Sequence, residues 1–229
     1  QSADTCCGKA WIADAEKCTL FPDKAILIGE LLTSLPYKTF ALTSIDALAH
    51  AIEALLSPKA NPYTDMYARS AISGIVENLQ ETRKTKKLPQ DMQKSLICAN
   101  MAGVAFSIAG CATMHALSFP LGANCQLAHG EAVYAVFAQT LQYYQKKNIP
   151  LYKLENALKD LPADISSVSG LQKLLTEIYP CPDFKALGID EGICDTWAVS
   201  VYEKQQRLLV NSPCVLNSND LAAIYKSCI

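Results

Sequence analysis

The 229-residue sequence lacks an excess of charge of either sign and has few aromatic residues. Twenty Lys and Arg stand against 22 Asp and Glu, a formal net charge of -2, and only 8 % of the residues are aromatic. Proteins that bind nucleic acids neutralise the phosphates with a basic surface or stack the bases on aromatic rings. The composition therefore argues against a nucleic-acid-binding protein, and we expect no nucleic-acid partner.

The sequence also lacks a Cys-x-x-Cys pair, although it contains ten cysteines. These cysteines are scattered, and several lie inside apolar helical patterns, where a free thiol behaves as a small hydrophobic side chain. A reduced, cytoplasmic compartment fits this usage better than an oxidising one. An initiator Met and an apolar signal segment are missing from the first nine residues, so we expect the chain to begin inside a longer protein.

Fixed charges are absent from residues 95–128, a stretch that is long enough to cross a membrane on length alone. Polar residues, a proline and several glycines interrupt this stretch, and its ends carry no aromatic belt. A buried pair of helices joined at Ala109 and Gly110 explains it better than a transmembrane helix. We therefore expect no membrane partner.

Strands are not indicated either, because the apolar residues recur at helical spacing almost everywhere. From residue 150 onward, short amphipathic helices alternate with loops that contain proline. Before that point, the spacing predicts helices over residues 37–56, 62–83 and 88–109, a short helix over 112–117 that stops before Pro120, and a helix from Gly130 to about Gln145.

These patterns predict an all-α fold, a multi-helix bundle without internal repeats or a long flexible linker. Residues 1–24 read as an irregular interdomain segment that ends in the turn signal Phe21-Pro22-Asp23. Residues 25–229 form the expected all-helical domain.

Histidine is scarce: the sequence contains only His50, His115 and His129, so each one can be considered as a candidate ligand. His50 follows Asp46 by four residues on one predicted helix, so the carboxylate and the imidazole project from the same face. Asp46 also lies on the apolar stripe of that helix, where an unpaired carboxylate is costly. These side chains are either ordinary polar groups satisfied by hydrogen bonds or, taken together, ligands of one divalent metal ion.

Two other kinds of site find less support. The sequence has no GxGxxG or GxxxxGK[ST] loop, so it offers no dinucleotide or phosphate cradle of its own, and it has no GxSxG elbow. A cysteine nucleophile is conceivable at Cys125, close to His129, or at Cys111, close to His115. Neither cysteine has a clear positive charge beside it in the sequence to lower its pKa.

Two long segments resemble the metal signatures of the iron-containing (group III) alcohol dehydrogenases. The first runs from Thr43 to Asp65 and includes Asp46 and His50. The second combines residues 103–110, 114–123 and 128–132, with His115 and His129. The resemblance extends from about Lys24 to the C-terminus and implies the helical C-terminal domain of that family, a fold like that of dehydroquinate synthase.

The resemblance implies that Asp46, His50, His115 and His129 bind one catalytic divalent ion, Fe(II) or Zn(II). It also implies NAD as the cofactor that exchanges hydride with an alcohol, while the ion acts as a Lewis acid on the alcohol oxygen. Lys9 is similar in position to a lysine that contacts this cofactor in the family. The family's N-terminal α/β nucleotide-binding domain, with its glycine-rich loop, is absent from this sequence, so we expect that missing domain to hold most of the NAD.

Within the family, residues 35–38, 115–120, 129–132 and 205–211 are similar to bacterial 4-hydroxybutyrate dehydrogenases. This similarity implies a small alcohol or aldehyde substrate, 4-hydroxybutyrate or succinate semialdehyde, with Arg207 as the partner of its carboxylate. Many family members have a histidine where this chain has Phe119. We expect Phe119 to line the substrate pocket. Because Phe119 cannot ionise, any proton relay must use another group.

The leading hypothesis is thus the catalytic half of an NAD-dependent alcohol dehydrogenase, working as a homo-oligomer such as a dimer. The alternative is a truncated, non-catalytic metal-binding or oligomerisation domain of the same family. A metallohydrolase that uses the same ion is less well supported, because no general base is evident beside the four ligands.

Overall fold

The computed structural model describes residues 24–229; Lys9 and nearly all of the expected interdomain segment over 1–24 lie outside the described residues. Over that range the chain forms helices and turns without a strand, which confirms the predicted all-α class. The helices are η2 (Gly29–Leu32, 3-10), α2 (Tyr37–Leu56), α3 (Pro62–Thr85), α4 (Met92–Ala109), α5 (Thr113–Cys125), α6 (His129–Lys146), α7 (Tyr152–Leu158), α8 (Val168–Ile178), α9 (Glu191–Lys204), α10 (Gln206–Leu209) and α11 (Ser218–Lys226).

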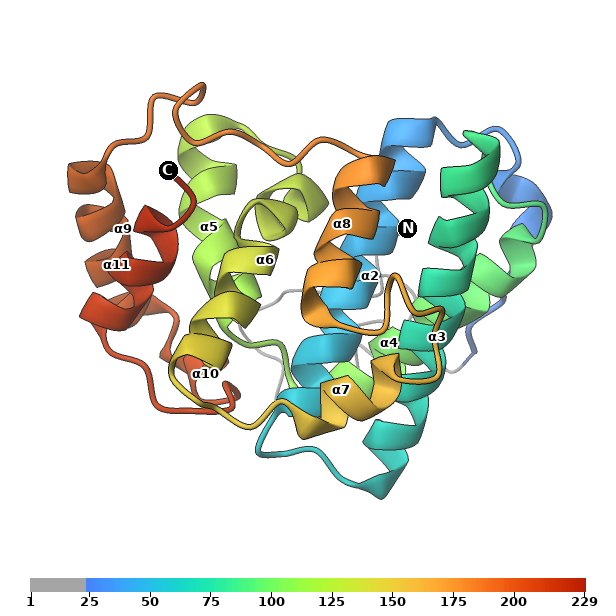
Figure 1. The fold of residues 1–229 in the computed structure, drawn as a ribbon, viewed down its shortest axis with the longest axis horizontal. Helices are drawn as coiled ribbons and strands as arrows, with labels where there is room; N and C mark the ends of the chain where they lie inside the picture. The colour runs from blue at the N-terminus through green and yellow to red at the C-terminus, as the bar shows by residue number, and fades with distance from the viewer. Residues whose placement is uncertain (1–23) are drawn as a thin grey trace.

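The helices pack in two groups that meet along α2 and α6 (Figure 1). Helices α2, α3 and α4 pack against one another at one side of the molecule, and α8 covers α3 and α6. At the other side, α5 packs on α6, and α9 pairs with α11. A single core of buried apolar side chains continues through both groups, so the bundle fixes α2, α5 and α6 relative to one another.

Helix α2 is buried on nearly every face, which its sequence explains. It begins after Pro36 and is built mainly of Ala, Leu and Ile, so a helix without a polar face can be packed on all sides. Three ionisable side chains are nevertheless buried in it, namely Asp46, His50 and Glu53. Buried charges need partners, and those partners lie on α5 and α6.

The uncharged stretch 95–128 forms the buried helix pair that its composition predicts. Helix α4 ends at Ala109, and Gly110 takes a left-handed φ of 84°, so that α5 continues at 106° to α4. A side chain at Gly110 would also collide with Asn211, which comes within 2.3 Å of an added Cβ. The close approach and the backbone angle together require glycine at this corner.

By length and composition alone, α2 is long and apolar enough to cross a membrane, and the bent pair α4–α5 would count as one more span. In α2, 78 % of the apolar window is buried inside the protein. Since the core helix of a folded domain passes the same test, this is weak support for a membrane span.

Two predicted helix boundaries are wrong. The helix expected from Leu88-Pro89 begins at Met92, because Asp91 caps its N-terminus by accepting a hydrogen bond from the Lys94 amide at 2.8 Å. Helix α5 does not stop before Pro120 but continues through it to Cys125.

The break at Pro120 is avoided because tertiary contacts compensate for it. Proline removes one helical hydrogen bond and crowds the carbonyls of the preceding turn. The hydroxyl of Tyr225 donates to the Leu117 carbonyl in that turn at 2.5 Å, within the core. Since Leu117 and Leu121 are also fully buried, packing holds the helix across the proline.

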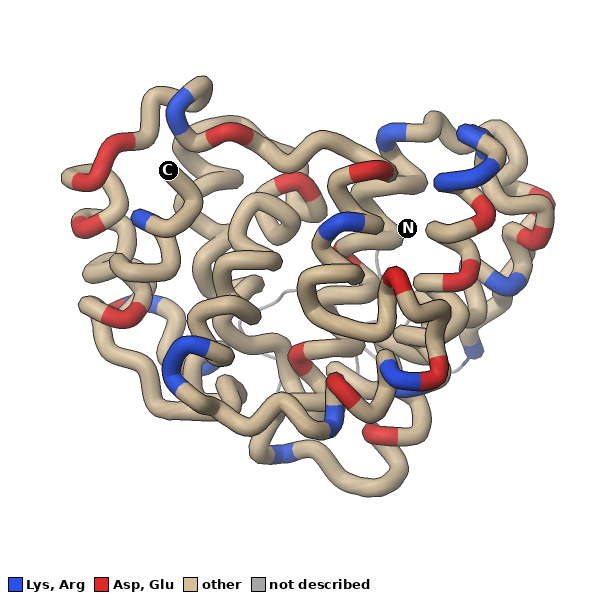
Figure 2. Tube along the Cα trace, viewed as in Figure 1, with Lys and Arg blue, Asp and Glu red and all other residues tan. Residues whose placement is uncertain are grey.

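Charged residues of both signs are interspersed over the described part of the chain (Figure 2). Many lie on the outer turns, as in the pair of Lys94 with Glu77 and the pair of Lys153 with Asp65. The few buried ionisable groups therefore stand out from an otherwise ordinary surface.

Candidate metal centre

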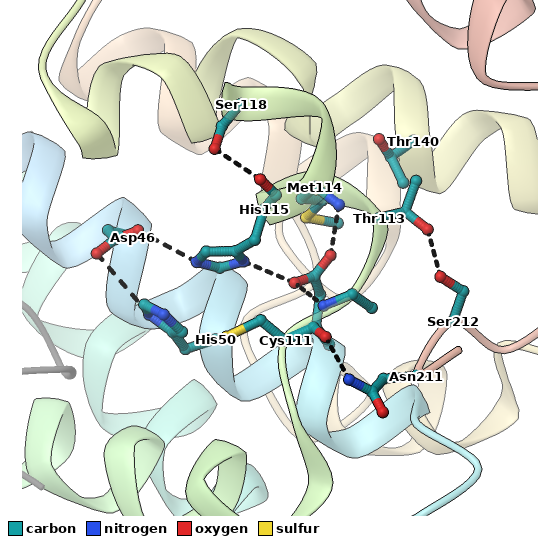
Figure 3. Close-up of polar contacts among 12 residues, drawn as sticks. Asp46, His50, Cys111, Thr113, Met114, His115, Ser118, Thr140, Asn211 and Ser212 are labelled. Atoms are coloured by element: carbon teal, nitrogen blue, oxygen red, sulfur yellow. Dashed lines mark hydrogen bonds and ion pairs between the residues drawn. The ribbon is translucent and has the colours of Figure 1, made fainter. Parts of the chain in front are cut away.

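Three helices bring the predicted ligands together, and Figure 3 shows three of these ligands, Asp46, His50 and His115. Asp46 and His50 lie one turn apart on α2, His115 lies in the first turn of α5, and His129, expected at the end of a loop, is the first residue of α6. Asp46 Oδ1 lies 3.5 Å from His115 Nε2 and 3.4 Å from His129 Nε2. His115 and His129 follow Asp46 by 69 and 83 residues in the sequence, and both thus lie close to one oxygen of its carboxylate.

These separations suit coordination of one ion. In a tetrahedral site with bonds of 2.0–2.1 Å, neighbouring ligand atoms lie about 3.4 Å apart. Donor atoms of Asp46, His115 and His129 all lie within 4.8 Å of one another. The geometry of this trio therefore fits a divalent ion without a large rearrangement.

His50 approaches the same carboxylate from the other side. Its Nδ1 lies 3.8 Å from Asp46 Oδ2, and its ring stacks on Phe106 with centroids 4.3 Å apart. The His50 and His115 rings are 4.1 Å apart. His50 also belongs to a second close group, because its donor atoms lie within 4.8 Å of those of Cys111 and His115.

Burial leaves polar atoms of the cluster without hydrogen bonds. Asp46 is 1 % exposed and His115 is fully buried, yet Asp46 Oδ1 and His115 Nε2 have no hydrogen-bond partner. A bound cation would satisfy both atoms, whereas an empty site leaves them desolvated. The side chain of His129 is 46 % exposed, so the cluster opens to solvent on that side.

The surroundings of Asp46 and His50 shift the pKa of each side chain so that it has the protonation state that binds a metal. Burial opposes the charge on Asp46, but the three imidazoles outweigh it and hold the pKa of Asp46 at about 2. Burial lowers the pKa of His50 to about 3, and the neighbouring His115 adds to that effect. Asp46 is therefore a carboxylate and His50 a neutral imidazole at neutral pH, the protonation states that bind metals.

His115 behaves differently because two carboxylates touch it. Burial alone would lower its pKa, but Glu53 and Asp46 overcome this effect and raise the pKa of His115 to about 10. Without an ion, the ring therefore carries a proton that a metal must displace.

Glu53 is a member of this cluster that sequence reasoning missed. It is 4 % exposed on α2, and its Oε2 lies 2.6 Å from His115 Nδ1. The available signal was a second carboxylate seven residues after Asp46, two turns along the same apolar helix face. That signal does not identify a partner, because the groups that Glu53 contacts lie about 60 residues further along the chain.

The segment that carries His115 is held by further hydrogen bonds (Figure 3). Asn211 Nδ2 donates to the Cys111 carbonyl at 2.8 Å, and the hydroxyls of Thr113 and Ser212 are 2.6 Å apart. The Tyr144 hydroxyl donates to Thr113 at 2.7 Å. These contacts tie the start of α5 to α6 and to the segment after α10, so the position of His115 is strongly constrained.

Gly130 allows α6 to approach α2 beside the ligands. A Cβ at this position would lie 2.5 Å from the Leu42 carbonyl oxygen and 3.4 Å from Asp46 Cβ. Real Cβ atoms do not approach backbone oxygens so closely, so glycine is required here. The residue before it is His129, which links this close approach directly to the position of a predicted ligand.

The residues expected to bind substrate lie on two helices, Phe119 on α5 and Arg207 on α10. Phe119 is 39 % exposed and follows His115 by one turn of α5. It lines a cleft of about 450 Å³ between α5 and α9, where the cationic lining residue is Lys204. Arg207 is an exposed residue of α10 and is not among the residues that line this cleft.

Neither of the two cysteines weighed as nucleophiles is well placed to attack a substrate. Cys111 is 3 % exposed, so a substrate could not reach its sulfur in this conformation. Burial raises the pKa of the Cys125 thiol above its usual range, which keeps it protonated at neutral pH.

The fold and the donor set thus define a class: an all-helical domain with a half-open cluster of one carboxylate and three imidazoles, chemistry that fits iron(II) or zinc(II). A comparison with known protein families narrows this class. Residues 40–229 match the C-terminal part of the Fe-containing alcohol dehydrogenase family, and the chain belongs to that family.

Characterised relatives support this assignment. The 4-hydroxybutyrate dehydrogenase of Clostridium kluyveri is 36 % identical over 214 residues, which cover 90 % of this chain and 57 % of the relative. Long-chain-alcohol dehydrogenase 1 of Geobacillus thermodenitrificans is 32 % identical, with 91 % of this chain and 54 % of the relative covered. The chain therefore spans little more than half the length of these relatives.

Solved structures show the same fold. The iron-containing alcohol dehydrogenase of Thermococcus thioreducens matches with a TM-score of 0.79 at 21 % identity, covering 93 % of this chain and 56 % of that one. A 1,3-propanediol oxidoreductase matches with a TM-score of 0.74 at 25 % identity, covering 88 % and 54 %.

Proposed function

We propose that this chain supplies the metal-binding half of an alcohol dehydrogenase active site. Together with a nucleotide-binding half, it transfers hydride between a primary alcohol and NAD. The observation that carries this proposal is the meeting of His115 and His129 at one oxygen of Asp46, at 3.5 and 3.4 Å, in a member of the family. The site works in the cytoplasm, in a homo-oligomer such as a dimer.

Asp46, His50, His115 and His129 hold the ion, iron(II) or zinc(II). When bound, it supplies a Lewis acid that polarises the oxygen of the alcohol or aldehyde. Asp46 contributes the negative charge that partly balances the cation. The buried His50 and His115 close the inner side, so substrate approaches past the half-exposed His129. Phe119 cannot exchange protons, so the proton of the alcohol would pass to water, to the ribose of the cofactor or to another group.

The relative and the cleft support the substrate that we propose. The 36 % identical relative is a 4-hydroxybutyrate dehydrogenase, so we assign 4-hydroxybutyrate and succinate semialdehyde to this chain. Phe119 lies about 6 Å along α5 from His115, at a rise of 1.5 Å per residue. Lys204 then offers a cation for the substrate carboxylate in the cleft, and Arg207 is the alternative suggested by the sequence.

A second candidate is a metal-binding or oligomerisation domain without catalytic activity. One observation fits it: the four predicted ligands all lie on α2, α5 and α6, so this chain by itself offers a complete set of metal ligands. The ion would then stabilise the bundle without taking part in a reaction.

An assay of NADH oxidation with succinate semialdehyde separates the two candidates. We expect turnover by the iron- or zinc-loaded chain when a nucleotide-binding half of the family is supplied, and at least 100-fold less turnover by His115→Ala. Butanal, which lacks the carboxylate, serves as the comparison substrate. The absence of turnover with any supplied half, despite full metal loading, would favour the non-catalytic domain.

A further inference from the structure

Glu53 joins the two helices that carry three of the four predicted ligands. Its Oε2 accepts the backbone N–H of Ala112 at 2.8 Å and lies 2.6 Å from His115 Nδ1. Its Oε1 accepts the backbone N–H of Met114 at 2.5 Å. One buried carboxylate on α2 therefore fixes the first turn of α5 and the ring of His115 together.

The two nitrogens of His115 face different carboxylates. Nδ1 faces Glu53, and Nε2 faces Asp46 Oδ1 at 3.5 Å. An ionised carboxylate accepts hydrogen bonds but cannot donate them. Because Nδ1 lies at hydrogen-bond distance from Glu53, at 2.6 Å, while Nε2 is 3.5 Å from Asp46, the proton of a neutral His115 resides on Nδ1. The lone pair of Nε2 then points toward the centre of the cluster.

We propose that Glu53 is the positioning residue of the metal centre: it selects the His115 tautomer and holds the ring so that Nε2 ligates the ion. The inference rests on the proposed metal site. Because a carboxylate partner makes the imidazole a stronger donor, Glu53 also tightens binding without touching the ion or the substrate.

The contacts distinguish this role from that of a simple helix cap. The two backbone N–H groups would be satisfied by any acceptor at the start of α5, including a neutral one. The short contact to His115 Nδ1 uses the same oxygen and adds nothing to the cap. Buried carboxylate oxygens need hydrogen-bond donors, and Nδ1–H of His115 gives Glu53 a side-chain donor beside the two backbone N–H groups.

Glu53→Gln tests the proposal in the 229-residue chain. Zinc affinity is measured by chelator competition, and unfolding of the ion-free chain by circular dichroism. We expect the zinc dissociation constant to rise about 10- to 100-fold. Glu131→Gln is the matched control, because Glu131 also lies close to a ligand in sequence but pairs outward with Lys38 at 3.2 Å; its dissociation constant should stay within about twofold of the wild type.

The outcomes separate the inference from the proposed function. Tight zinc binding by the wild type together with equal binding by Glu53→Gln overturns the inference and leaves the proposed metal site standing. If the wild type itself binds no zinc, the proposed function fails, and the inference fails with it.

A second measurement uses the wild-type chain, so it tests the proposal even if Glu53→Gln does not fold. With only three histidines, the ¹⁵N–¹H spectrum of the zinc-loaded chain can be assigned ring by ring. We expect His115 to bind zinc through Nε2, with its Nδ1 proton shifted far downfield by the hydrogen bond to Glu53. Ligation through Nδ1, or an Nδ1 proton in rapid exchange with water, would overturn the inference.

Discussion

At the residue scale, His115 is the centre of the cluster. It lies between Glu53 and Asp46 and is fully buried, so its protonation is decided by these two carboxylates more than by solvent. Its pKa of about 10 means that the ion-free ring is charged at neutral pH. The metal and a proton therefore compete for the same nitrogen.

This competition predicts a proton release. At pH 8, Asp46 is already ionised with a pKa of about 2, and His50 is neutral with a pKa of about 3. Of these three ligands only His115 has a proton to lose, so zinc binding should release about one proton and weaken about tenfold for each pH unit below 8. Titration calorimetry in two buffers of different ionisation enthalpy measures this number, and a value near zero would contradict the pKa assigned to His115.

The stability of the ion-free chain should respond to pH with the opposite sign. Because folding raises the pKa of His115, its paired, charged form stabilises the folded state fully below the unfolded pKa of about 6.5. This contribution is lost as the pH rises through about 10. Raising the pH thus weakens the ion-free fold while it strengthens metal binding.

The four residues that the structure brings together could be singled out in the sequence because histidine is rare and Asp46 interrupts an apolar stripe. Glu53 could not be assigned a role in the same way. Its partners are two backbone amides and a ring nitrogen on α5, and the sequence does not encode backbone positions directly. Tertiary contacts of this kind appear only when α2 and α5 are placed together.

At the scale of the helices, the approach of α6 to α2 decides where His129 lies. Gly130 touches the Leu42 carbonyl, and no side chain fits between the helices there. Periodicity predicted both helices but not this contact, because the spacing of apolar residues gives the buried face and not the distance to the neighbour. The prediction that the helix ends before Pro120 is wrong for the same reason, because a tertiary contact decides it. Tyr225, near the C-terminus, stabilises α5 by a hydrogen bond to the Leu117 carbonyl.

Gly130→Ala should therefore damage the metal site through the helix packing. The added methyl group forces α6 away from α2, at a cost of about 1–3 kcal/mol and a fall in Tm of about 2–4 °C per kcal/mol. Zinc affinity should fall as His129 moves from Asp46. Gly122→Ala is the control, because its Cβ would meet nothing closer than the Leu127 carbonyl oxygen at 3.8 Å. It should leave the zinc affinity unchanged and should not lower Tm, since alanine has a higher helix propensity than glycine. Wild-type zinc affinity in Gly130→Ala would show that the approach of the helices does not position His129.

At the scale of the whole molecule, the chain is one helical bundle that corresponds to little more than half of its relatives. Its uncharged middle, residues 95–128, is explained by a buried corner between α4 and α5 beside the cluster. Among residues 24–229, the interior thus combines an ordinary apolar core with one group of buried Asp, Glu and His side chains, and the proposed metal centre is built on that group.

X-ray absorption at the zinc edge of the loaded chain tests the central claim most directly, because His115 belongs to two close donor groups that differ in one atom type. One group adds Asp46 and His129, and the other adds His50 and Cys111. We predict about one ion per chain with only nitrogen and oxygen neighbours at about 2.0–2.1 Å. A sulfur neighbour at about 2.3 Å, or no retained ion, would contradict the account.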